Sequence, residues 1–387
     1  MERKPPTMKA LIVYLGRKGG GPVFSLELAR ALSKRISVEA IVSAYADNVG
    51  AWRTAELPVH FIKTYTGPLS AGLSLLGWRR FRSIGRIAAA FQPDVVHYPM
   101  GHTWAPILNF TAFRAFPRVA TVHDPRSHLG EKHTRLSFLL RKVALWHVER
   151  VVILSEALLE DMHDRGVPPD RIDVIPLGEF SYYQSGAETD VGENMTSERR
   201  RTLLFFGRLR EYKGLEILAE SFRILKEAVP DARLLIVGSG DFRPYAAAFA
   251  AMQDVTIVNR FVADSEVNEF FAQAGVLVVP YVEASQSGVI PIAYPLGIPV
   301  VATDVGGLKE QVEDGVSGFL VPPRDPAALA HKCAELMLDK DTYARLSDGA
   351  RVTARTKMSW DHIAELTVAC FEKAIGASQQ DAPATSP

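Results

Sequence analysis

Two cations stand five residues apart in the segment 206–214, which reads FGRLREYKG. The segment follows a short apolar run that is typical of a buried strand, and it precedes a stretch with helical periodicity. Amides at a helix N-terminus favour anions, and Arg208 with Lys213 would neutralise the charge that builds on a departing diphosphate. The spacing therefore indicates a diphosphate-binding turn. Two solvated loop charges are the alternative interpretation.

The elements that must position this turn follow an alternating pattern. Short β-branched runs alternate with amphipathic stretches in both halves of the chain, which is typical of parallel strands joined by crossover helices. Strands are predicted at 10–14, 38–42, 59–62, 95–98, 119–122, 151–154, 174–175, 203–206, 234–237, 256–258, 276–279 and 300–302. In the first half, helices are predicted at 24–35, 70–91, 136–149 and 156–165. The fold class is therefore α/β.

The length of 387 residues exceeds the size at which one hydrophobic core normally keeps growing, so two domains are expected. A polar stretch with little apolar periodicity marks the boundary between them. We predict an N-terminal domain at 1–183, a linker at 184–200 and a C-terminal domain at 201–356. A last helix at 357–377 is expected to cross back to the first domain, before a disordered tail at 378–387.

The composition indicates which partners the protein can bind and in which cellular compartment it works. Lys and Arg together number 44, as do Asp and Glu, so the overall charge does not indicate nucleic-acid binding. The two cysteines, Cys333 and Cys370, form neither a disulfide framework nor a zinc motif, which favours a reducing compartment. The apolar run 10–15 is too short for a signal peptide or a membrane span, so a cytoplasmic protein is predicted.

Further motifs follow the diphosphate turn in order: VGSGD at 237–241, RFV at 260–262, PVVATDVGG at 299–307 and GVSGFLV at 315–321. With the Gly-Arg-Leu-x-x-x-Lys-Gly pattern at 207–214, this set resembles the family 4 glycosyltransferases. The resemblance implies a retaining GT-B enzyme, in which two Rossmann-like domains face a cleft and Arg208 and Lys213 hold the donor diphosphate. It also implies donor contacts from Gly207, Gly238, Gly240, Phe261 and Val262.

The loop at 282–293, VEASQSGVIPIA, departs from the family pattern. Relatives carry two glutamates here, one near the donor sugar and one on the ribose. Glu283 matches the first, with the spacing to Gly297 off by one residue, but the second position falls at Pro291 or Ile292. This form resembles a subgroup from bacterial surface polysaccharide assembly. It implies a catalytic Glu283, with a solvated carboxylate as the alternative, and donor contacts from Ser285, Gln286, Ser287, Gly288 and Val289.

A glycine-rich loop, GRKGGG at 16–21, lies between the first predicted strand and helix. It is not a Gly-x-Gly-x-x-Gly motif, and the second strand lacks the terminal acid that would hold the ribose of a dinucleotide, which disfavours a nicotinamide dehydrogenase. The resemblance implies that Gly19, Gly20 and Gly21 approach donor phosphate and acceptor. A structural tight turn is the alternative.

The fifth predicted strand ends in polar residues, where the carboxyl edge of a parallel sheet borders a ligand crevice. His123 resembles the histidine that family members direct at the donor sugar, which implies a catalytic role; a structural histidine is the alternative. His128 and Glu131 are predicted to contact the acceptor. A metal site at His123, Asp124 and His128 is also conceivable, although their spacing is not a common zinc signature.

No metal and no cofactor are expected. The only Asp-x-Asp pair, Asp339 and Asp341, lies between two predicted C-terminal helices and is interpreted as a helix cap. Arg208 and Lys213 would take the place of a metal ion beneath the diphosphate. Because that leaving group can itself accept the acceptor proton, retaining transfer needs no pair of catalytic carboxylates.

The predicted helix at 70–91 mixes Trp78 and several aliphatic residues with four arginines and contains no acidic residue. A basic amphipathic helix of this kind can lie on an anionic membrane. The alternative is a helix that packs its apolar side on the sheet while its arginines face water. The membrane interpretation implies peripheral contact at the inner face of the membrane and a lipid-linked acceptor.

The predicted function is transfer of a sugar from a UDP or GDP donor to a glycan or lipid-linked acceptor, in polysaccharide or glycoconjugate biosynthesis. Closure of the two domains would expel water and align the reactants. Two alternatives stay open. One is a nucleotide-sugar 2-epimerase of the same fold, and the other is a non-catalytic partner subunit, which the missing second glutamate favours.

Overall fold

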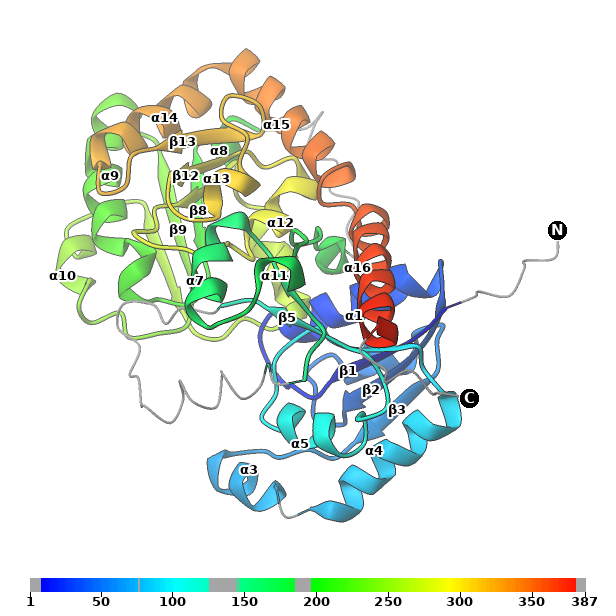
Figure 1. Cartoon of the computed structure of the whole chain (residues 1–387). Helices are drawn as coiled ribbons and strands as arrows, with labels where there is room; N and C mark the ends of the chain where they lie inside the picture. Colours follow the sequence, from blue (N-terminus) through cyan, green and yellow to red (C-terminus); the bar gives the residue numbers. More distant parts are fainter. Residues whose placement is uncertain (1–7, 76, 125–144, 146, 185–195, 381–387) are drawn as a thin grey trace, which may run out of the picture. The chain divides into compact units, whose positions relative to one another are not determined.

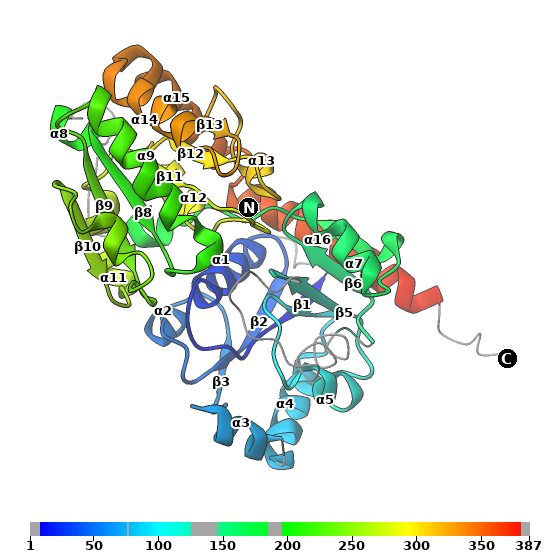
Figure 2. The same cartoon turned by 90° about the vertical axis from the view of Figure 1, so that its left-hand side faces the viewer.

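The computed structural model describes residues 8–75, 77–124, 145, 147–184 and 196–380. These residues form two compact units (Figures 1 and 2). Unit 1 contains the described residues up to Gly178 and those from Trp360 onward, and unit 2 runs from Glu179 to Ser359. The chain therefore leaves unit 1 and returns to it.

Unit 1 is built on a parallel sheet of seven strands in the order β3-β2-β1-β4-β5-β6-β7. The strands are β1 (Lys9–Tyr14), β2 (Ser37–Ser43), β3 (Val59–Ile62), β4 (Val95–Tyr98), β5 (Arg118–Val122), β6 (Arg150–Ile153) and β7 (Ile172–Val174). Their helices are α1 (Gly21–Ser33), α2 (Val49–Arg53), α3 (Pro68–Ser74), α4 (Trp78–Phe91), α5 (Ala105–Phe110), α7 (Leu159–Asp164) and α16 (Trp360–Gln380). Continuous apolar strands such as ALIVY at 10–14 are typical of a parallel sheet that is buried on both faces.

Unit 2 repeats this plan with six parallel strands in the order β10-β9-β8-β11-β12-β13. The strands are β8 (Thr202–Phe206), β9 (Arg233–Gly238), β10 (Val255–Asn259), β11 (Val276–Val279), β12 (Val300–Thr303) and β13 (Gly318–Val321). The helices are α8 (Ser197–Arg200), α9 (Leu215–Ala228), α10 (Ala246–Phe249), α11 (Asp264–Phe271), α12 (Ile290–Ala293), α13 (Leu308–Gln311), α14 (Pro326–Leu338) and α15 (Lys340–Arg355). The predicted class of two α/β parallel-sheet domains is confirmed.

Each sheet has one point at which its strand order reverses. In unit 1 this switch point lies between β1 and β4, and in unit 2 it lies between β8 and β11. Neighbouring crossovers diverge there to opposite faces, which leaves room at the carboxyl ends of the strands for a ligand. The predicted turn at 207–214 follows β8 and the predicted loop at 282–293 follows β11, so the topology explains their position.

The terminal helix α16 packs on unit 1, where it lies beside α1 and contacts β4, β5 and β6 (Figure 1). Its buried side includes Ile363, Phe371 and Ala374. Lys373 donates a hydrogen bond of 2.7 Å to Asp173 in β7, and Asp173 also pairs with Arg150 in β6. The helix continues to Gln380, so the expected tail begins too early at 378, and 381–387 lie outside the described residues.

The structure corrects several predicted elements. The expected helix at 70–91 is two helices, because the chain turns before Gly77, which precedes α4. Helix α1 begins at Gly21 rather than at 24, since Pro22 is tolerated in a first helical turn. Strand β13 was not predicted, because it begins at a glycine, Gly318, which weakens the strand pattern in the sequence. The structure requires that glycine, since a Cβ there would lie 2.2 Å from the oxygen of Val300. Most of the expected helix at 136–149 lies outside the described residues.

The described residues of the predicted linker, 184 and 196–200, belong to unit 2. Residues 196–200 contain α8, whose first turn is capped by the Thr196 hydroxyl, which accepts a hydrogen bond from the amide of Arg199. None of the helices in the described part of the chain combines the length and the apolar character that a membrane-spanning helix needs.

Candidate active site

The carboxyl ends of β8 and β9 approach so closely that a side chain at Gly238 would clash with the backbone of the facing strand. The amide of Gly207 donates to the oxygen of Val237 at 2.9 Å, and a Cβ on Gly238 would lie 1.7 Å from the oxygen of Gly207. Both glycines have positive φ angles, 130° at Gly207 and 150° at Gly238. Next to them, Leu209 donates to Ser239 at 2.9 Å. The turn that carries Arg208 is therefore fixed against the neighbouring strand.

The two predicted phosphate-binding cations stand on this turn. Arg208 is exposed, whereas Lys213 is partly buried at the end of a short 3-10 helix, Glu211–Lys213. The Lys213 nitrogen lies 3.5 Å from the ring centroid of Tyr281, which follows β11. Gly214 closes the turn with φ 71°, and a Cβ on it would lie 1.9 Å from the oxygen of Pro280. The structure thus brings the 208–214 turn to the end of β11, at the switch point.

The loop after β11 is held by hydrogen bonds from two further segments. The Thr303 hydroxyl, at the end of β12, donates to the oxygen of Tyr281 at 2.6 Å. The side chain of Gln311 accepts from the amide of Ser287 at 2.7 Å and donates to its oxygen at 3.0 Å. Gly306 lies against the oxygen of Ala284, with no room for a Cβ. These contacts fix the backbone of the Ser-Gln-Ser-Gly loop without any ligand.

The predicted donor-binding residues of this loop differ in exposure. Ser285 and Ser287 are buried, and the Ser287 hydroxyl lies 3.3 Å from the hydroxyl of Tyr281. Gly288 is exposed, and a Cβ placed on Gly207 would lie 4.0 Å from a methyl group of Val289. The structure therefore brings the loop next to the Arg208 turn.

The two positions of this loop that carry glutamates in the family pattern differ in residue type and in burial. Glu283 is partly buried in the first part of the loop. Pro291 and Ile292, where the sequence lacks the second glutamate, are buried in α12. The carbonyl oxygen of Pro291 accepts a hydrogen bond of 2.9 Å from the amide of Phe180. A carboxylate at Ile292 would need space in the core, so the apolar residues match their surroundings.

The remaining predicted donor contacts lie further out in the sheet. Gly240 forms a bridge with Leu209 beside the Arg208 turn. Phe261 and Val262 follow β10, one strand beyond β9, and their side chains are 57% and 9% exposed. Arg260 pairs with Glu266 in α11, which fixes the start of this segment. All of these residues lie at the same carboxyl edge of the sheet of unit 2.

In unit 1 the glycine-rich loop forms the start of a helix. Gly20 caps α1 and Gly21 is its first residue, while Gly19 has φ 83°. A Cβ on Gly19 or Gly20 would meet nothing within 4 Å, whereas one on Gly21 would lie 3.0 Å from Met100. Gly19 and Gly20 thus leave open space around the N-terminal amides of a 13-residue helix, where an anion is favoured.

His123 follows β5 and has one nitrogen already engaged. Its Nε2 lies 2.9 Å from the oxygen of Pro99, and because a carbonyl only accepts, Nε2 carries the proton. Burial lowers the pKa of His123, although Pro99 and Asp124 act against this shift. The neutral ring therefore presents Nδ1 as a hydrogen-bond acceptor. Its position is fixed by the edge-on ring of Phe24, with the centroids 4.9 Å apart.

Sequence reasoning missed His97, which lies in β4, the strand next to β5. His97 is 1% exposed and its Nε2 lies 2.9 Å from the hydroxyl of Thr121. Burial, with a smaller effect from His123, lowers the pKa of His97 to about 3. Tyr281 and Gln311 were also missed. The signal for Tyr281 was its place directly after a predicted strand, but nothing in the local sequence indicates the long-range partners of Gln311.

His128 and Glu131, the predicted acceptor contacts, lie outside the described residues. Within the described ranges, no three His, Cys, Asp or Glu side chains gather closely enough to hold a metal ion. The interpretation of Asp339 is confirmed: it caps α15, where its carboxylate accepts from the amides of Asp341 and Thr342 at 2.9 and 3.1 Å.

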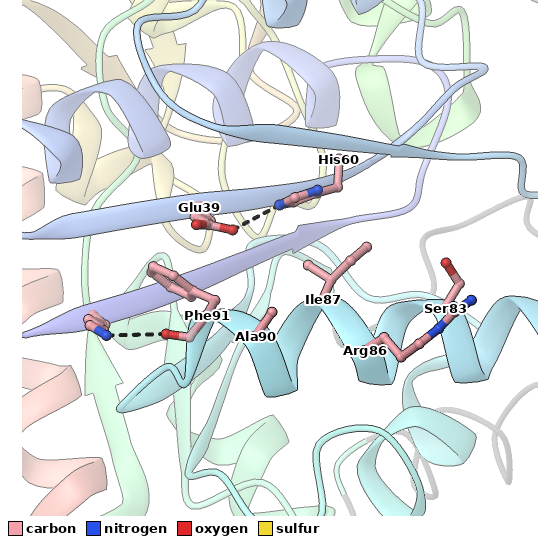
Figure 3. A pocket seen from close by; sticks show the side chains of 8 residues that line it. Glu39, His60, Ser83, Arg86, Ile87, Ala90 and Phe91 are labelled. Carbon is pink, nitrogen blue, oxygen red and sulfur yellow. Dashed lines mark hydrogen bonds and ion pairs between the residues drawn. The ribbon is translucent and has the colours of Figure 1, made fainter.

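A groove of about 600 Å³ lies elsewhere in unit 1, between α4 and the sheet (Figure 3). It is lined by Lys9, Glu39, His60, Ser83, Arg86, Ile87, Ala90 and Phe91. Glu39 and His60 are joined at 2.8 Å, from two neighbouring strands (Figure 3). Lys9 is the first residue of β1, so the groove lies toward the amino ends of the strands and contains none of the predicted site residues.

Comparison with known proteins agrees with this arrangement. Residues 18–178 match the family described as "Glycosyltransferase Family 4", and residues 200–339 match "Glycosyl transferases group 1". A D-inositol 3-phosphate glycosyltransferase of Xylanimonas cellulosilytica is 30% identical over 93% of this chain and 93% of its own length. The chain belongs to the family 4 glycosyltransferases. The predicted enzyme class, a glycosyltransferase, is therefore confirmed.

Two solved structures illustrate the fold that this chain shares with known proteins. HepE of Anabaena, solved in complex with UDP and glucose, aligns with a TM-score of 0.72 over 94% of this chain and 99% of its own, at 20% identity. Sucrose-phosphate synthase of Thermosynechococcus elongatus aligns with the same TM-score over 95% and 100%, at 18% identity. The predicted GT-B fold is confirmed.

Proposed function

We propose that this glycosyltransferase uses a sugar linked to a nucleotide diphosphate and that unit 2 binds the diphosphate between Arg208, Lys213 and the loop at 285–289. The observation that carries the proposal is the convergence of the glycine turn after β8 and the fixed loop after β11 at one switch point. Preformed cations and amides at that point stabilise a leaving group whose negative charge grows as the sugar departs. HepE, which shares the fold, was solved with UDP.

Within this proposal, the reaction retains the configuration of the sugar. The bond between the anomeric carbon and the diphosphate oxygen breaks while the acceptor oxygen bonds to the same face of the sugar. The departing diphosphate takes the acceptor proton, so the protein needs no dedicated base. Glu283 is the carboxylate proposed to stabilise the positive charge that develops on the sugar ring, and it is partly buried in a loop whose backbone is fixed.

For unit 1 we propose a sugar-binding role for His123 and for the amides at the start of α1. His123 is held with Nε2 on Pro99, so its Nδ1 is suited to accept a hydrogen bond from a sugar hydroxyl. Gly19 and Gly20 leave the first turn of α1 uncovered by side chains. This arrangement suits a neutral sugar or a phosphate better than a cation.

For the acceptor and the pathway, only the chemical class is proposed. A relative that aligns over nearly the whole chain is named a D-inositol 3-phosphate glycosyltransferase. We propose that this chain transfers to a glycan or lipid-linked acceptor in polysaccharide or glycoconjugate biosynthesis, with a UDP or GDP donor. A reducing cytoplasm suits Cys333 and Cys370, which are both buried free thiols.

The test is turnover of a panel of UDP and GDP sugars by the whole protein and by Arg208→Ala and Lys213→Ala variants. Each variant is expected to lose activity by about a hundredfold or more while thermal unfolding shows that it is still folded. Arg210→Ala is the matched control, because Arg210 is an exposed cation of the same turn outside the predicted pair. Near-normal turnover in both variants would refute the assignment.

The configuration of the product supplies the second readout. Proton NMR of the product should show the anomeric configuration of the donor. Inversion would contradict the retaining mechanism, and conversion of the donor to its 2-epimer without any acceptor would contradict transfer itself.

A further inference from the structure

A continuous segment of unit 1 carries positive charge without any acidic residue. Between Glu56 and Asp94 the sequence contains no Asp or Glu and five cations: Lys63, Arg79, Arg80, Arg82 and Arg86. This segment includes α3 and α4, which follow one another in the chain (Figure 1). Although the net charge of the whole chain is zero, this segment is therefore locally basic.

Packing on the sheet accounts for one face of α4. Phe81, Ile84 and Ala88 are buried at helical spacing and belong to the apolar core of unit 1. The four arginines of α4 lie on its exposed surface. A helix that only covers a sheet would need no other apolar side chain outside this core.

Three large apolar side chains nevertheless lie outside it, around the junction of α3 and α4. Leu73 is 70% exposed, Leu75 is 42% exposed and Trp78 is 60% exposed. The guanidinium of Arg82 lies 4.7 Å from the Trp78 ring, so the aromatic side chain and a cation occupy the same surface. Exposed apolar residues in a cluster, surrounded by cations, mark an interaction surface.

Carboxylates next to α4 already have partners. Glu39 is bonded to His60 on the sheet side of the groove, opposite Arg86 and Ser83 of α4 (Figure 3). Asp94 accepts a hydrogen bond of 2.7 Å from the amide of Lys9. Within the part of the chain that the structure describes, neither carboxylate forms an ion pair with an arginine of α4. The surface therefore suits an anionic partner with an apolar layer beneath its charges.

We propose that the surface formed by Leu73, Leu75, Trp78, Arg79, Arg80, Arg82 and Arg86 docks onto an anionic lipid bilayer. The two leucines and the tryptophan enter the boundary between headgroups and acyl chains, and the arginines contact lipid phosphates. A nucleic acid would use the arginines alone, whereas the exposed leucines favour a bilayer. The inference goes beyond the proposed transfer reaction, because docking requires neither donor nor acceptor.

The test is flotation of the full-length protein with two kinds of vesicle, phosphatidylcholine alone and phosphatidylcholine with phosphatidylglycerol. Wild-type protein should float with the anionic vesicles, less so at high salt, and not with the neutral ones. An R79Q/R80Q/R82Q variant should bind about a hundredfold more weakly. An L73S/L75S/W78S variant should also lose binding, because the remaining arginines then lack an apolar anchor.

Matched controls use exposed residues elsewhere in unit 1. An R35Q/R53Q/R114Q variant has the same change in net charge, and Phe110→Ser removes an aromatic side chain that is 51% exposed. Both should bind like wild type, and thermal unfolding should show that every variant is folded. Absence of wild-type binding, equal loss in the controls, or full binding by L73S/L75S/W78S would each overturn the proposal. Since no sugar is present, these outcomes are independent of transferase activity.

Discussion

The ammonium nitrogen of Lys213 lies 3.5 Å from the ring centroid of Tyr281, although 68 positions separate the two residues in the chain. The ring faces a cation on one side, and its hydroxyl lies 3.3 Å from that of Ser287. Tyr281 thus connects the turn after β8 with the loop after β11. A cation over an aromatic face gains electrostatic stabilisation, which restricts where Lys213 can point.

Removing the Tyr281 ring should therefore reduce activity without removing either cation. We expect Tyr281→Leu to lower kcat/KM for the nucleotide sugar by about tenfold, the effect of losing a cation–π contact of roughly 1 to 2 kcal/mol. Tyr281→Phe keeps the ring and loses only the hydroxyl, so its kcat/KM should stay within about threefold of wild type. Steady-state kinetics decide the matter, and equal losses in the two variants would show that the hydroxyl matters instead.

The close approach of Gly207 and Gly238 predicts a large loss of stability in Gly238→Ala. A Cβ there meets a carbonyl oxygen at 1.7 Å, and φ is 150°. We expect the free energy of unfolding to fall by about 3 kcal/mol or more. Gly288→Ala in the same unit is the control, because a Cβ there meets nothing within 4 Å. Urea unfolding measures both, and a small effect of Gly238→Ala would contradict the described geometry.

The buried imidazole of His97 makes stability depend on pH. Its pKa is about 3 in the folded protein, below the ordinary value of 6.5. Below pH 6.5, therefore, His97 binds a proton in the unfolded chain but stays neutral in the folded chain. Stability should fall as the pH drops from about 6 to about 4, with His97 contributing roughly 1 kcal/mol per pH unit. His97→Gln should flatten this dependence. Unfolding midpoints across that range provide the measurement, and an unchanged slope in the variant would be inconsistent with a neutral buried His97.

Substitutions at the two ends of the ion pair between Asp173 and Lys373 should lower the free energy of unfolding by different amounts. Burial favours the neutral form of Asp173, but hydrogen bonds from Arg150 and Lys373 outweigh it and lower its pKa. Asp173→Asn should cost about 3 kcal/mol, because the Arg150 side chain is only 11% exposed and would lose its charged partner. Lys373→Met should cost less than about 1 kcal/mol, since Lys373 is 56% exposed. Chemical unfolding compares the two variants; equal losses would show that Lys373, not Arg150, is the main partner, because Asp173→Asn removes both pairs.

Much of this architecture follows from patterns that are local in the sequence. Apolar runs such as LLFF at 203–206 and VLVV at 276–279 specify buried parallel strands, and the polar residues after them mark the carboxyl edge. The turn with Arg208 and Lys213 could be predicted because it directly follows one of these apolar runs. Strand β13 was missed because it starts at a glycine, so its apolar run is only the three residues 319–321.

The parts that were not predicted depend on contacts between distant segments. Gln311 holds the backbone of Ser287, 24 residues away, and no local pattern marks this pair. The burial of His97 depends on α16, whose Phe371 ring lies 5.3 Å from the imidazole. Only the folded chain brings these residues together, so a sequence pattern cannot rank them above other polar residues.

The return of α16 to unit 1 has a consequence for synthesis on the ribosome. Unit 2 consists of residues that are all translated before Trp360, so it can fold while the chain is still growing. Unit 1, although it begins first, stays incomplete until its last helix emerges and covers β4, β5 and β6. The domain that is translated first is therefore the one completed last, and nascent chains that stop before residue 360 leave its apolar surface open to chaperones.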